Sequence, residues 1–469
     1  MHSNRIKSLL EDIRFWIIFF CLLRLYGITN PPLEVAHNWR QTTVTMVARN
    51  FYENDANIFY PRVDFAGNKS GVTGMEFPLL NYLIYAVSLL FGYAHWYGRI
   101  INLIVSGLGC YFFYRLVMKY FGYKTAFNST ILLLCSIWFA YSRKIMPDTF
   151  SVSLTLAGVY CGIRFFEGGR KWTSLVGYVV LCSAGILSKL PAVCVLVVGL
   201  PLFFSTKYEI SAKIIFAIAG LLLLIPVGFW YGYWVSYLVE QYGFQHFFMG
   251  KNAITGFREI IAELPLTLSQ FYENAMKFSG FAVFILGVYF AIAKHNKLLT
   301  TLLLLVFATF FIVIIKAGST FTHHAYYMIP FVPVMALTGG YGIAQINIKW
   351  LAVVLLLAVA AEGIANQQHD FRIKKKDKTL VNIEQDMDKI SGKNDLVVIN
   401  SGAYPTPMYF AHRKGWIAFN AQISDSTFIT GLQQQGARYI IILKKTFGSE
   451  LLLPYKKLVS NDYYDIYGL

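Results

Sequence analysis

The stretch Glu34-Val-Ala-His-Asn-Trp-Arg-Gln41 opens a polar, charged run that extends from Pro31 to Pro78 between two strongly apolar segments. The run closes with Met75-Glu-Phe-Pro-Leu79. Consecutive membrane spans are usually joined by a few residues, whereas this run holds carboxylates, a histidine, arginines and aromatic side chains. We therefore interpret it as a functional surface rather than a connector.

The composition places most of the chain in a membrane. The 469 residues are 56% hydrophobic and 14% charged, with a mean hydropathy of +0.50, whereas soluble domains carry roughly 25% charged residues. The net charge of +16 does not indicate nucleic acid, because many Lys and Arg residues lie in short joints between apolar runs. The positive-inside rule puts such joints on the cytoplasmic side. The other cations lie in outward loops, where they could meet an anionic substrate. All six cysteines fall within or beside apolar runs and lack metal-ligand spacing.

Apolar runs of about 20 residues predict membrane-spanning helices. We expect eleven, several of them short, near residues 14–30, 98–117, 125–142, 149–166, 173–188, 190–204, 213–233, 278–294, 298–316, 325–345 and 350–366. The basic joints share one face if the N-terminus is cytoplasmic, which puts loop 31–97 and the C-terminal tail outside. Leu79–Phe91 is too short to span and is predicted to lie in the outer interface as an amphipathic helix.

The composition changes near Asn366. Residues 367–395 are highly charged, and the short apolar runs 396–399 and 439–443 are typical of β-strands. The predicted fold is a polytopic α-helical membrane protein of about eleven spans with a small C-terminal α/β extracytoplasmic domain. Residues 1–366 would form the transmembrane domain, with interfacial helices in its outer loop, and residues 367–469 the small domain.

The first loop carries candidate acid–base and anion-binding groups. Residues 38–52 have helical periodicity, which predicts an amphipathic helix lying flat on the membrane. Glu34 and His37 precede this helix, and a carboxylate beside a membrane cleft can accept a proton from a hydroxyl group. Three arginines could hold a phosphate by charge-assisted bonds: Arg40, Arg49 and Arg62. The alternative is an interfacial anchor, since Trp, Tyr and Arg favour that zone whatever the function.

The joint between two later spans holds Arg143, Lys144 and Asp148. Cations on the outer face depart from the positive-inside rule, and binding of a phosphate-bearing ligand would explain their presence there. The alternative role for Asp148 is to cap the helix that follows it.

Two more polar positions lie at the same outer level. Lys189 lies between two apolar runs, where an ionisable group is a functional candidate unless it snorkels to the interface. His324 and Tyr327 belong to a polar cluster in which one histidine could hydrogen-bond a substrate. Adjacent histidines point in different directions on a helix, so His323 and His324 do not predict a shared metal site.

The order of these motifs resembles bacterial members of glycosyltransferase family 39, relatives of the dolichyl-phosphate-mannose protein mannosyltransferases and of the aminoarabinose lipid A transferase. The resemblance covers about residues 10–345. Its motifs are His37-Asn-Trp-Arg-Gln41, Ala48-Arg-Asn-Phe-Tyr52, Tyr60-Pro61, Val63-Asp64, Glu76-Phe-Pro-Leu79, Arg143–Asp148, Leu187-Ser-Lys189 and His324-Ala-Tyr-Tyr327.

The resemblance implies a type C glycosyltransferase membrane fold, a first-loop carboxylate as general base and basic residues that hold a lipid phosphate. Many relatives carry Asp-Glu where this chain has Trp39-Arg40-Gln41, so Glu34 is the predicted base, as the nearest upstream acid, and Asp148 is the second candidate. Glu76 matches a position that in some relatives lies near a metal ion. The adjoining lysine of those relatives is Phe77 here.

We therefore expect an inverting, polyprenyl-phosphate-sugar-dependent glycosyltransferase (hexosyl- or pentosyltransferase) in the bacterial inner membrane, with its site on the outer face. Its partners would be the donor, membrane lipid and an acceptor glycan, lipid or protein. No metal site is predicted, and a divalent cation is the one cofactor left open. The alternative is a transporter or flippase of an amphipathic lipid-linked substrate, a class often built from paired halves with broken helices. A non-catalytic scaffold with a partner-binding tail is the second alternative.

Overall fold

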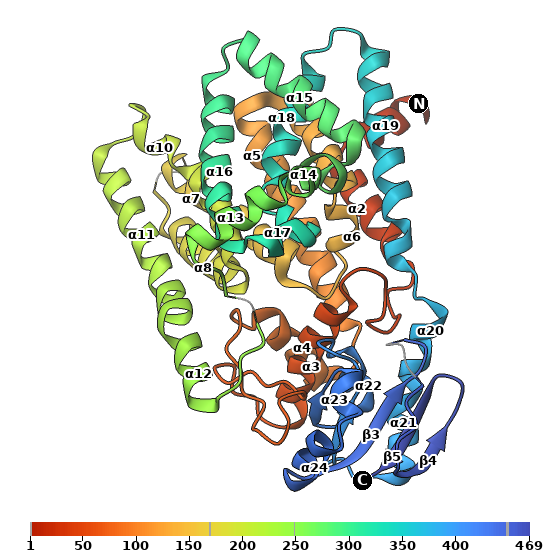
Figure 1. Ribbon diagram of the computed structural model, residues 1–469. Helices are drawn as coiled ribbons and strands as arrows, with labels where there is room; N and C mark the ends of the chain where they lie inside the picture. Colours follow the sequence, from red (N-terminus) through yellow and green to blue (C-terminus); the bar gives the residue numbers. More distant parts are fainter. Residues whose placement is uncertain (1, 168–169, 248, 447–449) are drawn as a thin grey trace. The chain divides into compact units, whose positions relative to one another are not determined.

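The computed structural model describes residues 2–167, 170–247, 249–446 and 450–469. The chain divides into two compact units that are each assembled from three segments. Unit 1 comprises Met1–Ile28, Arg99–Tyr233 and Phe248–Gln368, and unit 2 comprises Thr29–Gly98, Trp234–Phe247 and His369–Leu469. Helices make up unit 1, whereas unit 2 combines helices with a five-stranded sheet (Figure 1).

Unit 1 is an assembly of helices, most of which are apolar. They are α1 (His2–Glu11), α2 (Ile13–Leu23), α5 (Tyr97–Cys135), α6 (Trp138–Tyr141), α7 (Pro147–Glu167), α8 (Trp172–Ser188), α9 (Val193–Leu196), α10 (Pro201–Phe204), α11 (Ile210–Phe229), α13 (Ala253–Ala262), α14 (Leu264–Ser269), α15 (Lys277–Ala293), α16 (Lys297–Ala317), α17 (Ser319–His323), α18 (Val332–Ala344) and α19 (Lys349–Gln367).

Five helices of the described chain are long and apolar enough to cross a membrane, and six if the bent pair Leu264–Ala275 and Lys277–Ala293 forms one span. Each of the eleven predicted segments is at least partly helical. Two of them join in α5, where Gly122 takes a φ of 78° that interrupts the helix. Others are shorter than 18 residues, among them α2, α8 and α18. The count of eleven spans stays a prediction.

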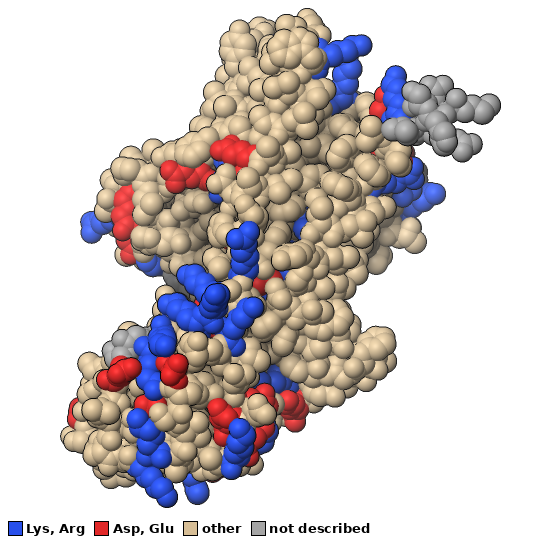
Figure 2. Space-filling model, turned by 90° about the vertical axis from the view of Figure 1, so that its right-hand side faces the viewer, with Lys and Arg blue, Asp and Glu red and all other residues tan. Residues whose placement is uncertain are grey.

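The outward-facing apolar surface of unit 1 matches a membrane environment. Only 28% of the most apolar part of α16 and 17% of that of α19 is buried, although both are strongly apolar. Water would penalise such exposure at about 25 cal/mol per Å², so these faces suit lipid. Figure 2 shows broad areas of one face with few charged side chains.

Helices α7 and α8 pack closely because small residues line their contact. A Cβ atom added at Gly185 would lie 2.6 Å from the carbonyl oxygen of Ser151, and one at Gly158 would lie 2.5 Å from the Sγ of Cys182. Small residues at such positions let two helix backbones approach in a membrane. The close packing places the start of α7 beside the end of α8.

Unit 2 combines the first loop with the C-terminal tail. Its helices are α3 (Asn38–Glu53), α4 (Leu79–Phe91), α12 (Val235–Tyr242), α20 (Lys375–Lys378), α21 (Ile383–Ile390), α22 (Thr406–Ala411), α23 (Asn420–Ile423) and α24 (Ser426–Gln434). Its strands are β1 (Leu396–Ile399), β2 (Gly415–Ile417), β3 (Ala437–Leu443), β4 (Lys456–Ser460) and β5 (Tyr464–Gly468). The order is β2-β1-β3-β5-β4. The first three strands are parallel, and β5 and β4 are antiparallel additions.

The tail is a small α/β fold, as predicted, and its two predicted strands are β1 and β3. Alternate residues of the sheet, such as Val398, Ile440 and Ile442, pack against Ile429 and Leu432 of α24. These buried aliphatic side chains supply the apolar contact that holds the helix on the sheet.

The first loop clusters with this tail, whereas the sequence grouped it with the spans. The backbone of Gly67 donates to the carbonyl oxygen of Gly415 at 2.7 Å, and the Gly415 amide donates to that of Asp64 at 2.9 Å. Residues 62 and 72 form a further bridge within the loop. Main-chain bonds therefore join two segments that are far apart in sequence.

Helix α3 forms where predicted, and protein covers its polar face as well as its apolar face; its orientation relative to a membrane surface stays a prediction. Every residue from Arg40 to Phe51 is buried, and the helix packs against α4 and α22. Its polar side chains have protein partners, such as Thr406 for Thr42 and Asp64 for Asn50. The polar face therefore does not need water.

Candidate active site

Asp148, which is buried, and Lys189, which is partly exposed, form an ion pair at the open end of the α7–α8 hairpin. Asp148 lies in the first turn of α7, where the helix dipole favours a carboxylate. Lys189 directly follows α8 in an extended conformation. Its Nζ lies 3.8 Å from the Asp148 Oδ1, and the two side chains are 15% and 5% exposed. Two residues that the sequence proposed separately therefore meet, with the ammonium group the more accessible of the two.

Aromatic rings surround the ammonium group of Lys189. Its Nζ lies 5.4 Å from the ring centroid of Tyr326 and 5.9 Å from that of Tyr327. The Nδ1 of His324 lies 2.9 Å from the carbonyl oxygen of Thr320, and its ring contacts Tyr326. His324 and Tyr327 thus join the same cluster, while the sequence did not single out Tyr326.

The joint that carries Asp148 is held by one buried amide side chain. The Nδ2 of Asn102 donates to the carbonyl oxygens of Tyr141, Lys144 and Met146 at 3.1, 2.7 and 3.2 Å. Its Oδ1 accepts from the Oγ1 of Thr149 at 3.1 Å. Buried polar groups of this kind rigidify a turn because each is satisfied. The detectable sequence signal was an asparagine inside an apolar run.

Arg143 and Lys144, predicted to contact a phosphate, have different settings. The guanidinium group of Arg143 is fully buried and donates to the carbonyl oxygens of Tyr26 and Gly27. The Nζ of Lys144 lies 5.5 Å from the ring centroid of Tyr141. Arg143 therefore holds the chain after α2 in place, and its direct contact with a phosphate stays a prediction.

In unit 2, Arg40 and Glu76 pair with each other. The two side chains form a buried ion pair, and the Arg40 guanidinium carbon lies 5.1 Å from the ring centroid of Phe247. Burial, with a smaller effect from Arg40, lowers the pKa of the neighbouring His246 to about 4, so this histidine is neutral at pH 7. Arg40 thus compensates the charge of Glu76.

Glu34 is positioned by the first residues of the tail. It is fully buried and forms an antiparallel bridge with Ile373, and the amide of Val35 donates to the carbonyl oxygen of Arg372 at 3.0 Å. The Nδ2 of Asn30 donates to the Glu34 Oε1 at 3.4 Å. His37 takes a left-handed conformation, φ 58°, directly before α3. The tail therefore helps to set the backbone of the predicted base.

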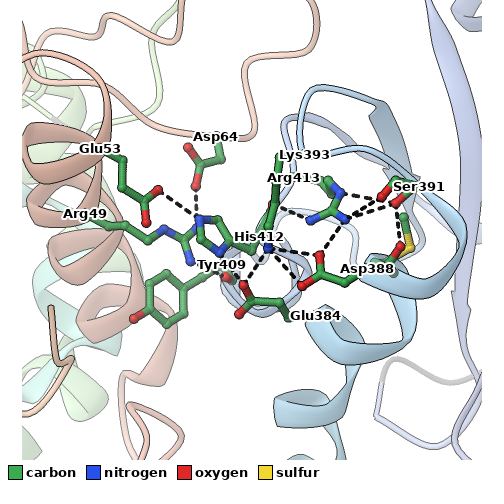
Figure 3. A network of polar contacts seen from close by, with 11 residues as sticks. Arg49, Glu53, Asp64, Glu384, Asp388, Ser391, Lys393, Tyr409, His412 and Arg413 are labelled. Carbon is green, nitrogen blue, oxygen red and sulfur yellow. Dashed lines mark hydrogen bonds and ion pairs between the residues drawn. The ribbon is translucent and has the colours of Figure 1, made fainter.

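Arg49 and Arg62, predicted phosphate ligands, are engaged within the protein. The Nη2 of Arg49 lies 2.9 Å from the Asp64 Oδ2, and its Nη1 donates to the Tyr409 carbonyl oxygen at 3.0 Å (Figure 3). Arg62 pairs with Asp55 at 2.8 Å. Asp64 belongs to the Val63-Asp64 motif, for which the sequence predicts no role.

His412 joins α3 to the tail (Figure 3). Its Nε2 lies 2.9 Å from Glu53 of α3, and its Nδ1 lies 2.5 Å from Glu384 of α21. The hydrogen bond with His412 is the main reason why the pKa of Glu384 falls to about 2. Burial lowers the pKa of His412, but its bonds to Glu384 and Glu53 outweigh that effect and raise it above the usual value. The sequence contained no signal for this bridge.

The described residues contain no group of three or more His, Cys, Asp or Glu side chains that could hold a metal ion. Glu76, the residue for which a metal neighbour was considered, pairs with Arg40 instead. The structure thus identifies no ligand set for the divalent cation that the sequence left open.

Residues 75–231 match the family model described as dolichyl-phosphate-mannose-protein mannosyltransferase. The resemblance predicted from the sequence is confirmed. The matched segment contains Glu76, Arg143, Asp148 and Lys189. No curated protein matches the sequence.

Solved structures with a similar fold include ArnT and the oligosaccharyltransferase AglB. ArnT from Cupriavidus metallidurans in the apo state is 12% identical with a TM-score of 0.61, and the alignment covers 97% of both chains. The same protein bound to undecaprenyl phosphate is 11% identical, with a TM-score of 0.58 and coverage of 97% and 98%. The archaeal oligosaccharyltransferase AglB from Archaeoglobus fulgidus, in complex with an inhibitory peptide and a dolichol-phosphate, is 11% identical, with a TM-score of 0.54 and coverage of 92% and 69%. The present chain thus shares this fold, and five of its described helices are long and apolar enough to cross a membrane.

Proposed function

We propose that this chain is an inverting glycosyltransferase that moves a sugar from a polyprenyl phosphate to an acceptor on the outer face of the inner membrane. The observation that carries the proposal is the Asp148–Lys189 pair, set among tyrosines within the segment that matches the mannosyltransferase family. The undecaprenyl phosphate bound to ArnT and the dolichol-phosphate bound to AglB support the donor class.

In the proposed reaction, a carboxylate accepts the proton of the acceptor hydroxyl group while the hydroxyl oxygen bonds to the anomeric carbon. The bond from that carbon to the phosphate oxygen breaks on the opposite side, so the configuration inverts and the lipid phosphate leaves. Asp148 and Glu34 are the two candidate bases. Asp148 has the stronger structural support, because it lies beside the partly exposed cation Lys189.

Lys189 is proposed to neutralise the leaving phosphate. Its ammonium group is more accessible than the guanidinium groups of Arg40, Arg49 and Arg143, which are almost fully buried with protein partners. The charge on the phosphate grows as the sugar leaves, so this contact would strengthen in the transition state.

The organisation of unit 2 supports a common side for the first loop and the tail. Hydrogen bonds link α3 directly to Tyr409 and His412 of the tail, and no membrane can separate groups that are bonded in this way. We propose that this side is extracytoplasmic, with the basic joints inside. Thiol labelling of single cysteines at Asn57 and Asp462 tests this, and a cytoplasmic location of either would contradict it.

The decisive experiment compares Asp148→Asn and Glu34→Gln in a transfer assay with radiolabelled polyprenyl-phosphate sugars. Loss of the general base should lower turnover by about 10²-fold or more with donor binding retained. Asp462→Asn, at an exposed acid of the tail, is the matched control. If Asp148→Asn and Glu34→Gln both transfer sugar like this control, the proposed base is wrong.

The variant Lys189→Ala helps to distinguish a glycosyltransferase from a lipid transporter. It should lower the rate of lipid-phosphate release at saturating donor, whereas Lys456→Ala, at an exposed lysine of the tail, should not. A wild-type protein that moves such lipids across vesicles but never cleaves the sugar–phosphate bond with any donor–acceptor pair would favour the transporter instead.

A further inference from the structure

Four exposed lysines lie in the chain shortly after the last candidate span. Two residues, Arg372 and Ile373, separate the end of the apolar segment Lys349–Phe371 from Lys374. We call Lys374, Lys375, Lys376 and Lys378 the juxtamembrane lysine cluster; all four are exposed. Because only 17% of the most apolar part of the preceding helix is buried, that helix suits direct contact with lipid. The cluster is therefore expected to lie at the level of the lipid headgroups, because it directly follows this helix in the chain.

The cluster differs from other lysines of the tail in its charge balance. Lys389, Lys393 and Lys457 pair with Asp386, Glu384 and Asp465 at 2.8, 2.8 and 2.9 Å. None of the four cluster lysines has an acidic partner among the described residues. The acid within the run, Asp377, is buried, and burial raises its pKa. The cluster thus presents excess positive charge.

The backbone of the cluster is ordered within unit 2. The Asp377 amide donates to the carbonyl oxygen of Lys374 at 3.0 Å, and the Oγ1 of Thr446 donates to that of Lys376 at 3.2 Å. Ile373, next to the cluster, bridges Glu34. Figure 2 views the side of Figure 1 on which α20 is drawn and shows Lys and Arg side chains gathered there. The lysines therefore occupy a defined surface close in sequence to the strand-like contact that positions Glu34.

We propose that the juxtamembrane lysine cluster binds the phosphate groups of anionic phospholipids in the surrounding membrane. Several lysines next to a span act additively on an anionic membrane surface, and each contributes about 1 kcal/mol. Compact ammonium groups suit mobile headgroups, because they do not need the fixed geometry of a guanidinium group. Lipid binding by the cluster does not require the chain to be a transferase. It would anchor Ile373, and with it the backbone of Glu34, at the interface.

The test uses the full-length protein, delipidated in a neutral detergent and titrated with phosphatidylglycerol or phosphatidylcholine. Native mass spectrometry counts the bound lipids. The test variant is Lys374→Gln/Lys375→Gln/Lys376→Gln, and the matched control, Lys389→Gln/Lys414→Gln/Lys456→Gln, removes the same charge elsewhere in the tail. We expect the test variant to bind phosphatidylglycerol about tenfold or more weakly, while the control keeps the wild-type affinity.

Two further arms make the outcome unambiguous. Replacing the same three lysines by arginine should restore phosphatidylglycerol binding, and thermal unfolding should show that all variants are folded. Inorganic phosphate at the same concentration should fail to displace the lipid, because the acyl chains of the lipid add apolar contacts that free phosphate lacks. Equal binding of the two lipids by the wild type, an equal loss in the control, or full displacement by inorganic phosphate would each overturn the proposal.

Discussion

Arg49 in unit 2 and Arg24 in unit 1 are both buried, but their guanidinium groups have different partners. Arg49 pairs with the Asp64 carboxylate at 2.9 Å. Arg24 donates to the Ser142 hydroxyl oxygen at 2.7 Å and to the Leu134 carbonyl oxygen at 3.2 Å. Leu134 lies in the last turn of α5, where carbonyl groups lack helical partners and carry partial negative charge.

The difference shows how each unit compensates a buried cation. Arg143 follows the pattern of Arg24 by donating to carbonyl oxygens after α2. Arg40 follows the pattern of Arg49 by pairing with Glu76. Arg24 and Arg143 of unit 1 thus donate to main-chain and hydroxyl oxygens, whereas Arg40 and Arg49 of unit 2 pair with carboxylates. Breaking a pair of full charges should cost more than removing a cation from neutral oxygens.

We expect the largest loss of folding stability for Asp64→Ala, which leaves the buried Arg49 without its carboxylate partner. Removal of one partner from a buried pair costs about 3–5 kcal/mol, so thermal unfolding of the purified protein should shift strongly downward. The double variant Arg49→Met/Asp64→Leu should recover much of the loss, because no buried charge is left. If the double variant were as unstable as Asp64→Ala, the carboxylate would not be the critical partner.

Arg24→Met should lower the folding stability less than Asp64→Ala does. The substitution removes the cation together with its need for partners, and the lost hydrogen bonds account for about 1–3 kcal/mol. The aliphatic side chain can still contact Phe139, whose ring centroid lies 5.1 Å from the guanidinium carbon. Thermal unfolding under the same conditions provides the comparison. A loss as large as that of Asp64→Ala would remove the distinction between the two units.

The smallest effect concerns pH and the His412 bridge in unit 2. The raised pKa of His412 means that its protonated form stabilises the fold fully below pH 6.5, and this contribution is lost as the pH rises through the raised value. Glu384, with a pKa of about 2, stabilises the fold above its ordinary 4.5, and this contribution is lost as the pH falls towards 2.

His412→Gln should therefore flatten the decline in stability above pH 6.5 by up to about 1 kcal/mol, the scale of partly exposed pairs. Glu53→Gln, which removes one of the two carboxylate partners, should flatten it in part. The measurement is the unfolding temperature as a function of pH. Parallel curves for the wild type and His412→Gln would show that the His412 bridge does not contribute to the pH dependence of stability.

The helices could be predicted well because their signals are local. Runs of apolar residues located each predicted membrane segment, and the periodicity of residues 38–52 located α3. Asp148 and Lys189 could be proposed because each interrupts or borders an apolar run. Their contact follows from the antiparallel packing of α7 and α8, which no single run of sequence specifies.

The partners of most other polar residues could not be predicted. The sequence predicts that Arg49 binds an anionic ligand, yet its guanidinium group pairs with Asp64 and donates to the Tyr409 carbonyl oxygen. Asn102 looked like an isolated polar residue, yet it holds three carbonyl groups of the Asp148 joint. A buried polar group takes whichever partner the completed packing brings within reach.

The sequence by itself determined the membrane class, the helical segments, the small α/β tail and the positions of Asp148 and Lys189 at helix ends. These depend on hydropathy and on spacing over a few turns. Only the tertiary structure decided that Ile373 bridges Glu34, that Arg40 pairs with Glu76 and that the tail joins the first loop in one unit. Those contacts join segments that are distant in the chain, and they form because buried charges and main-chain groups must find partners once water is excluded.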